Sequence, residues 1–219
     1  STRSAIQWLL VGTQVALSVT MLAGAGLLVR SLHELSRVDP GFEPARVLSF
    51  RMSGNYAEFG DYPRLLKRID TALEHLRALP GVEASATTFS APGVPTGFQV
   101  EFELVEARGD QGPRMVAESR VVSPEYFETL RIPLLEGTLC RRQTRDATEL
   151  MVNRAFADRY LAGRPSVSGF HLANANANVP PGRDAGLVGH VRESGLNQAP
   201  GPTLYFCSSA QGPTPYFLV

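Results

Sequence analysis

The sequence predicts an α+β protein, in which one N-terminal membrane helix precedes a water-exposed domain of mixed helices and strands. The 21 Lys and Arg and the 21 Asp and Glu residues all lie outside residues 6–29. Leucines at helical spacing follow over residues 61–79, and apolar and polar residues alternate strictly over residues 98–104, which is typical of a half-buried strand. With 43% hydrophobic residues, the chain has enough apolar side chains to build a core.

The first element is a membrane-spanning helix. Residues Ile6–Val29 contain no ionisable side chain, and as a helix they would be about 36 Å long. A hydrocarbon core of roughly 30 Å is therefore crossed with some tilt. A secretory signal sequence and the core helix of a soluble protein are alternatives, but signal sequences have shorter apolar cores and soluble helices seldom stay uncharged for this length.

The membrane helix carries small and polar residues on defined faces. One face collects two glutamines, a serine and an alanine, and a second row of small residues includes a glycine. Such faces suit hydrogen bonding and close packing between membrane helices, so we expect further helices beside this one. The expected contact residues are Gln7, Gln14, Ser18, Gly24 and Ala25.

An amphipathic stalk is expected to continue the membrane helix. Leu28, Leu32 and Leu35 form a stripe at i, i+4 and i+7, with charged residues on other faces. The run Asp39–Gly41 ends the helix because proline and glycine both break it there. Residues 1–38 are therefore predicted to be membrane helix and stalk.

A βαβ unit is predicted next. Residues 47–52 alternate as in a strand, and Asp61 caps a helix that Pro80-Gly81 ends. Residues 82–89 read as a strand that returns alongside the first.

Short strands dominate the rest of the chain. Residues 98–104 and 115–122 are expected to pair antiparallel, and Ser123 and Asn153 to cap two short helices that run to about residues 130 and 161. Proline and asparagine predict turns at 109–113 and 173–182. Further strands are expected at 150–152, 170–173, 186–191 and 216–219.

No catalytic, cofactor-binding or metal-binding residue is predicted. The four histidines are scattered without a metal-ligand spacing, and no P-loop or nucleophile motif occurs, so this chain is not expected to be an enzyme. A net charge of zero argues against nucleic acid as a partner. Cys140 and Cys207 could form a disulfide in an oxidising compartment or remain free thiols, and sequence spacing does not decide between these alternatives.

Five runs of the chain resemble FtsX-like ABC transporter permeases with a MacB-like periplasmic core domain, most closely the duplicated orphan permeases. VDPGF and SPEYFETL followed by IPLLEG are specific in combination. Two cysteine positions depart from the family pattern, which has GR-x-F where Gly137–Cys140 stands and a proline where Cys207 stands. The segment around Pro165–Gly169 also lacks the family's usual DP-x-GK-type turn. The matching runs are Gln14–Ser53, Leu76–Ala86, Val121–Gly137, Val152–Gly163 and Gly186–Gln211.

The resemblance implies a two-lobed core domain. A porter-like α+β lobe would begin at residues 44–97, and a β-rich lobe, residues 98–211, would be inserted into it. Residues 212–219 would then return to the first lobe, the remainder of which is expected beyond this chain.

The resemblance also implies a function without catalysis by this chain. It would be the transmembrane permease subunit of an ABC-type transporter or envelope machine in a bacterial cytoplasmic membrane. A separate ABC ATPase would drive it, its domain would lie on the extracytoplasmic side, and it would act as a homodimer or fused pseudo-dimer. In such permeases a stalk passes the motion of the membrane helices to this domain, and the resemblance implies that role here for Leu28, Leu32 and Leu35. The alternative is a membrane-tethered extracytoplasmic binding module for a peptide, lipid or lipoprotein.

Overall fold

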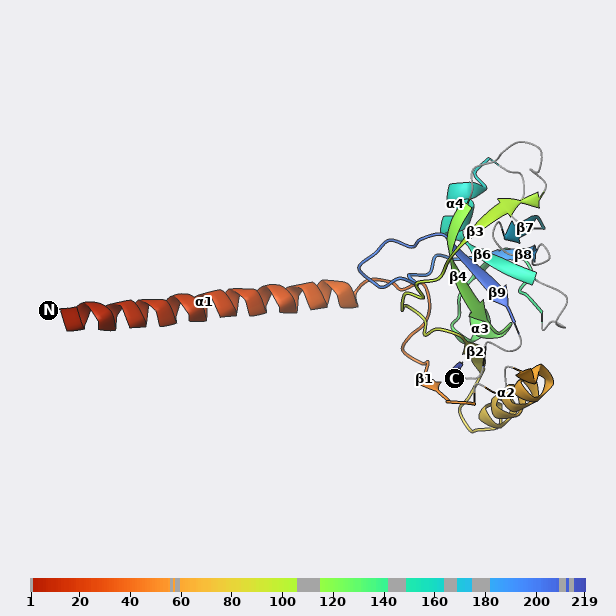
Figure 1. Ribbon diagram of the computed structural model, residues 1–219, viewed down its shortest axis with the longest axis horizontal. Coiled ribbons are helices and arrows are strands. Elements are labelled where there is room, and N and C mark those ends of the chain that lie inside the picture. The colour runs from red at the N-terminus through yellow and green to blue at the C-terminus, as the bar shows by residue number, and fades with distance from the viewer. Residues whose placement is uncertain are drawn as a thin grey trace. The chain divides into compact units, whose positions relative to one another are not determined.

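The computed structural model describes residues 2–55, 57, 60–105, 115–141, 149–163, 169–174, 182–208, 212 and 215–219 (Figure 1). The chain forms two compact units, Ser1–Asp39 and Pro40–Val219, which are described separately below. The turn expected at 109–113 and most of the polar loop expected at 173–182 lie outside the described residues.

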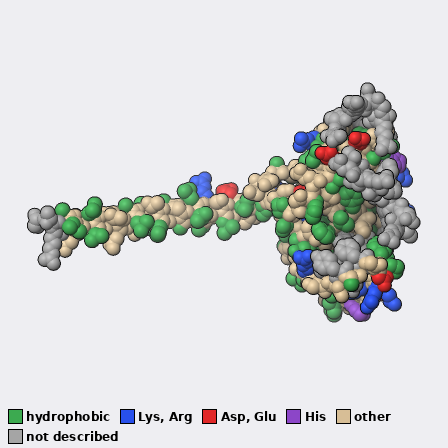
Figure 2. Space-filling view, in the orientation of Figure 1, with side chains coloured by type: hydrophobic (Ala, Val, Ile, Leu, Met, Phe, Trp, Pro, Cys, Tyr) green, Lys and Arg blue, Asp and Glu red, His purple; other side chains and the backbone are tan. Residues whose placement is uncertain are grey.

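The first unit is the single helix α1 (Thr2–Ser36). Its part Ser4–Ser36 is long and apolar enough to cross a membrane, and hydrophobic side chains are exposed along it (Figure 2). The helix ends two residues before the expected end of the stalk. There the amides of Arg37 and Val38 donate to carbonyls three residues earlier, which tightens the last turn.

The second unit contains ten strands and three further helices among its described residues. The elements are β1 (Ser49–Arg51), α2 (Tyr62–Arg77), β2 (Ala86–Thr88), β3 (Gln99–Leu104), β4 (Met115–Val122), α3 (Tyr126–Thr129), β5 (Leu134–Gly137), β6 (Glu149–Asn153), α4 (Arg154–Tyr160), β7 (His171–Asn174), β8 (Gly182–Val188), β9 (Thr203–Cys207) and β10 (Tyr216–Leu218).

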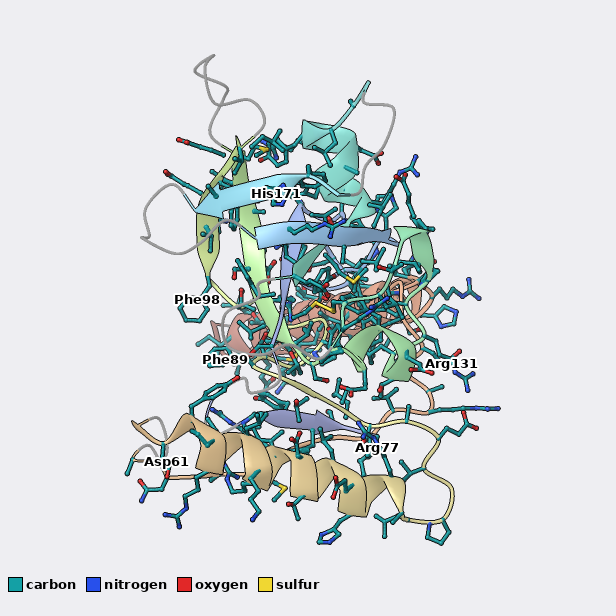
Figure 3. All side chains as sticks on the ribbon, turned by 90° about the vertical axis from the view of Figure 1, so that its right-hand side faces the viewer. Asp61, Arg77, Phe89, Phe98, Arg131 and His171 are labelled. Atoms are coloured by element: carbon teal, nitrogen blue, oxygen red, sulfur yellow. A yellow bond between two sulfur atoms is a disulfide. The ribbon has the colours of Figure 1, made fainter. Side chains whose placement is uncertain are left out.

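Helix α2 begins as the sequence predicts. The carboxylate of Asp61 accepts the amide of Arg64 at 3.1 Å, and α2 extends from there to Arg77 (Figure 3). Leu65, Ile69 and Leu73 form its buried stripe.

The strand order around α2 corrects one prediction. β2 does not lie directly alongside β1, because β10 lies between them and is antiparallel to both. In this register Phe50, Phe217 and Thr87 stand side by side. Phe217 is buried in the core beneath α2, and its ring stacks on Phe50 at 5.7 Å. The third strand therefore supplies the central aromatic side chain of this core.

Six strands close into a ring. Each strand pairs with the next in the order β4, β3, β7, β8, β6, β9, and β9 returns to pair with β4. All six contribute to one apolar core, and α4 adds Phe156 and Ala157 to it. Examples from the six strands, in ring order, are Met115, Phe102, Leu172, Leu187, Val152 and Leu204.

Strand β4 is buried on both faces. Met115 and Ala117 belong to the core shared with α4, whereas Val122 belongs to a second core beneath α3. Alternate residues of a strand point to opposite faces, so Arg120 shares the face of Val122. Its neighbour in the parallel register is Tyr205 of β9.

Helix α3 starts differently from the prediction. Its N-cap is Glu125, which makes no side-chain capping bond. The hydroxyl of Ser123 instead accepts the buried amide of Thr87 at 3.0 Å, while its carbonyl accepts the amide of Tyr126. Ser123 therefore joins β2 to the start of α3, because the buried Thr87 amide needs an acceptor.

Helix α4 confirms the predicted cap. Oδ1 of Asn153 accepts the amides of Phe156 at 2.9 Å and Thr203 at 3.0 Å, and Nδ2 donates to the carbonyl of Gly201 at 2.8 Å. One side chain thus caps a helix and fixes the start of β9, a strand that the sequence did not predict. Nor was β5 predicted.

The two cysteines are joined. Cys140, which follows β5, and Cys207 of β9 form a buried disulfide with their Cα atoms 6.2 Å apart (Figure 3). The two cysteine positions that depart from the resembled family pattern are therefore partners. The disulfide decides an alternative that sequence spacing left open.

Candidate functional site

The second unit begins with a fixed segment, Pro40–Glu43, here called the entry segment. The carbonyl of Pro40 accepts the amide of Arg192 at 2.9 Å, and the amide of Glu43 donates to the carbonyl of Leu130 at 3.0 Å. Phe42 packs against the core beneath α3. Backbone bonds and a side-chain contact therefore fix the chain where it enters the β-rich unit.

Gly41 allows the close approach between the entry segment and residues 190–192. Its φ is +83°, and a Cβ built there would lie 1.8 Å from the carbonyl oxygen of His190. Any L side chain would be strained by this φ and would overlap the facing backbone. The glycine of the VDPGF run is therefore a packing requirement.

The buried guanidinium of Arg120 contacts residues 190–198, here called the 190–198 loop. The Arg120 side chain is completely buried, and its Nη2 donates to the carbonyl of Glu193 at 2.8 Å. Nη1 donates to the Ser90 hydroxyl at 3.1 Å and to the Ala91 carbonyl at 3.2 Å. Nη2 also donates to the Val94 carbonyl at 2.5 Å. Arg120 therefore joins the loop after β2 to the 190–198 loop.

Glu193 is the main buried counter-charge. Its Oε2 lies 3.1 Å from Nε of Arg120, an ion pair without the alignment of a hydrogen bond. Oε1 accepts the hydroxyls of Tyr126 at 3.3 Å and Tyr205 at 3.0 Å, and Oε2 accepts the amide of Gly93 at 3.4 Å. The carboxylate thus has partners from α3, β9 and the loop after β2.

Glu118 completes the charge cluster, which we define as Glu118, Arg120, Glu193, Tyr126 and Tyr205. Its Oε1 accepts from Nη2 of Arg120 at 3.0 Å and from the amide and hydroxyl of Thr96, each at 3.2 Å. Its Oε2 accepts the hydroxyl of Ser194 at 2.6 Å. Glu118 and Arg120 share one face of β4, so the strand itself brings them together.

The buried location shifts the acidities of the cluster. Burial raises the pKa of Glu193, and the guanidinium of Arg120 opposes that rise. Burial together with the Glu193 charge raises the pKa of Tyr126 and of Tyr205 well above ordinary values. Burial opposes ionisation of Glu118 as well, but the Ser194 hydrogen bond and the Arg120 charge outweigh it, so the pKa of Glu118 is lowered.

The cluster is built for positioning. Its tyrosines stay protonated and donate to Glu193, and its arginine stays charged, so these three side chains keep one role across ordinary pH. Across the described stretches of the chain, no group of three or more His, Cys, Asp or Glu residues is arranged to hold a metal ion.

Sequence reasoning missed this cluster, although one signal was present. Arg120 stands in the middle of a strand that is otherwise rich in buried apolar positions, and Glu118 precedes it by two residues on the same face. A charge at such a position is unusual unless it is paired. Glu193, which is 73 residues further along, carried no comparable signal.

The residues singled out in the sequence all lie on α1, outside this cluster. Gln7, Gln14, Ser18 and Ala25 are exposed and Gly24 is half-buried. The hydroxyl of Ser18 donates to the carbonyl of Gln14 at 2.8 Å, so it is satisfied within the helix. Their role in packing between membrane helices stays a prediction.

The expected stalk residues also lie on α1. Leu28 and Leu32 are exposed, and Leu35 is half-buried. Their coupling role stays a prediction as well.

The sequence matches no protein-family model and no curated protein. Three solved structures are similar in fold. A domain assigned to a permease of Porphyromonas gingivalis has 13% identity and a TM-score of 0.48, with 78% of this chain and 72% of that chain covered. The periplasmic region of MacB from Actinobacillus actinomycetemcomitans has 13% identity and a TM-score of 0.49, with 84% and 78% covered.

The third structure is the extracellular domain of the noncanonic ABC-type transporter YknZ from Gram-positive bacteria, with 9% identity, a TM-score of 0.42, and 68% of this chain and 71% of that chain covered. At these identities and TM-scores the similarity concerns the fold alone.

Proposed function

We propose that this chain belongs to the transmembrane permease subunit of an ABC-type transporter or envelope machine, and that it has no catalytic role of its own. A separate ABC ATPase subunit hydrolyses ATP, and the β-rich unit passes the resulting motion on to substrate export or envelope remodelling. The subunit works as a homodimer or a fused pseudo-dimer.

One observation carries the proposal. The membrane helix α1 is followed, within four residues, by an entry segment whose backbone is fixed at Pro40 and Glu43 and whose Gly41 leaves no room for a side chain. A passive tether needs no such fixation, whereas transmission of movement needs a stiff connection. The resemblance of the VDPGF and SPEYFETL runs to FtsX-like permeases supports the same conclusion.

The disulfide supports an extracytoplasmic location for the β-rich unit. Disulfides persist in oxidising compartments and are rare in the cytosol. The Cys140–Cys207 bond therefore favours placing this unit outside the bacterial cytoplasmic membrane, independently of the charges that flank α1.

We also propose that the β-rich unit works as two lobes, residues 44–97 with 212–219 and residues 98–211. Two features support this division. The six-stranded ring encloses its own core, while Phe50 of β1 and Phe217 of β10 share a separate core with α2. The core beneath α3 combines residues of both proposed lobes, such as Leu218 and Tyr205. Between the two sets of strands, the sheet register records one paired position, Thr88 with Val122.

The test replaces Leu32-His33 by Gly-Gly in the full membrane protein, co-purified with its ATPase. Ala-Ala at the same positions is the matched control, because alanine keeps the helix stiff while both side chains are still lost. We expect Gly-Gly to abolish the ATP-dependent response of the β-rich unit, and Ala-Ala to retain it. A response that survives Gly-Gly, or a protein that binds no ATPase, would refute the proposal.

A second candidate function, capture of a ligand by a membrane-tethered module, has one observation in its favour. A hollow of about 480 Å³ lies along the outer face of α2, and cationic side chains dominate its lining. An acidic peptide or an anionic lipid headgroup would suit it. The lining residues are Arg64, Lys67, Arg68, Thr71, Ala72 and His75.

This candidate predicts that the membrane protein in nanodiscs binds a poly-glutamate peptide. The Arg64→Glu/Lys67→Glu variant should lose that binding, while Arg154→Glu, on the distant helix α4, should keep it. A flat titration of the unmodified protein would remove this candidate.

A further inference from the structure

The charge cluster joins segments that are distant in sequence and that border the entry segment. Arg120 contacts backbone carbonyls on both sides of it, at Ala91 and Val94 in the loop after β2 and at Glu193 in the 190–198 loop. The guanidinium is planar and presents its donors in a fixed fork, so it sets the distance between these two loops.

The same loop holds the entry segment. Arg192, whose amide donates to Pro40, directly precedes Glu193 in the chain. Gly93 donates its amide to the Glu193 carboxylate and lies close to both segments. A Cβ built at Gly93 would be 3.9 Å from the ring of Phe42 and 3.9 Å from the carbonyl oxygen of Arg192. The entry segment therefore contacts the 190–198 loop and lies beside the loop after β2, and the charge cluster joins these two loops to each other.

On the other side, the cluster is attached to the ring of strands. Arg120 belongs to β4, Tyr205 belongs to β9, and these two residues are neighbours in the parallel register. Tyr126 adds α3 through its hydrogen bond to Glu193. A continuous chain of polar contacts thus leads from Pro40 through Arg192 and Glu193 to two paired strands.

We infer that the Arg120–Glu193 pair is the clamp through which movement of the entry segment reaches the ring of strands. This inference rests on the proposed function and names the positioning residues within it. Without the clamp, the two loops still follow Pro40–Glu43. Tyr205 of β9 then loses its bond to Glu193, and of the cluster's links to the loops β4 keeps only those of Glu118, so both strands follow the loops less closely.

The pair can be removed without leaving a lone buried charge. Truncating one partner would strand the other charge in the interior and could unfold the protein. The double variant Arg120→Met/Glu193→Leu replaces both with apolar side chains of similar size, a change that proteins often tolerate. It keeps the interior filled and deletes the bonds of both side chains, which are those of Arg120 to Ser90, Ala91, Val94 and Glu118 and those of Glu193 to Gly93, Tyr126 and Tyr205.

The experiment uses the full membrane protein with its ATPase in nanodiscs. Hydrogen–deuterium exchange of β4 and β9 is compared with and without ATP by mass spectrometry. In the unmodified protein ATP should change this exchange. In the double variant ATP hydrolysis should continue, while the ATP-dependent change in β4 and β9 is reduced and a change in the 190–198 loop remains.

The matched control is Asn153→Ala, which weakens β6, α4 and the start of β9 without touching the cluster. It should lower the unfolding temperature and yet keep the ATP-dependent change, which separates coupling from stability. The conservative variant Tyr205→Phe keeps the Arg120–Glu193 pair and should also keep the change.

Three results overturn the inference in distinguishable ways. An unmodified protein whose exchange does not respond to ATP overturns the proposed function and the clamp together. An unmodified protein that responds, with an equal response in β4 and β9 of the double variant, overturns the clamp alone. A control that loses the response as fully as the double variant also overturns the clamp, because loss of stability would then explain the effect.

Discussion

The Gly41→Ala substitution measures how tightly the entry segment is fixed. The added Cβ would lie 1.8 Å from the His190 carbonyl oxygen, so the two segments must separate by more than an ångström. A non-glycine residue at this φ costs about 1–2 kcal/mol. The separation also breaks the hydrogen bond between Arg192 and Pro40, which is worth about 1 kcal/mol. We expect a loss of about 3 kcal/mol or more in the free energy of unfolding.

Gly81→Ala is the matched control. Gly81 has a φ of +88°, close to that of Gly41, but a Cβ there would meet nothing within 4 Å. It should therefore cost only the backbone strain, about 1–2 kcal/mol. Thermal unfolding of the full chain in detergent, followed by near-ultraviolet circular dichroism, should place Gly41→Ala about 4 °C or more below the control. Equal melting temperatures would show that the entry segment is free to shift.

Three further predictions concern the β-rich unit. The Cys140→Ser/Cys207→Ser double variant should have a free energy of unfolding about 4 kcal/mol lower, because the disulfide closes a loop across a sequence separation of 67 residues. An unchanged midpoint in urea unfolding would contradict this prediction. Asn153→Ala should lower the free energy of unfolding by about 2–4 kcal/mol, because α4 loses its cap and the Thr203 amide loses its acceptor. Asn153→Asp keeps the acceptor oxygen and should lower it less, which parallel thermal melts of the two variants would measure. The folded protein lowers the pKa of Glu118, so the ionised carboxylate adds to the free energy of unfolding above pH 4.5, and this addition is lost as the pH falls through the pKa of the folded state. Glu118→Gln should therefore reduce the loss of stability on acidification. Parallel stability–pH curves for the variant and the unmodified protein would refute the assignment.

The sequence predicted the elements whose signals are local. The cap at Asn153 and the buried stripe of α2 follow from residues within one or two turns of each other. The strand β4 was predicted with its observed bounds for the same reason. Local pattern and tertiary structure agree at these places because each element buries the face that its own periodicity makes apolar.

The sequence did not predict features that depend on distant partners. Strand β9 alternates poorly because it is buried on both faces, with Leu204 in the ring core and Tyr205 beneath α3. The insertion of β10 between β1 and β2 depends on pairing across more than 120 residues, which no local period encodes. Ser123 had the pattern of a cap, but a buried amide of β2 competed for its hydroxyl.

Arg120 shows how far a sequence can lead toward a site. A charge on a strand face that the neighbouring residues mark as buried must have a partner, because an isolated buried charge costs several kcal/mol. The rule predicts that a carboxylate lies within reach, and Glu118 meets it only in part, since its side chain is 15% exposed. The chain offers 21 acidic residues as candidates, and only the fold selects Glu193. That selection puts the counter-charge one residue from the amide that holds Pro40, and this position is the reason for proposing that the pair transmits movement in addition to stabilising the interior.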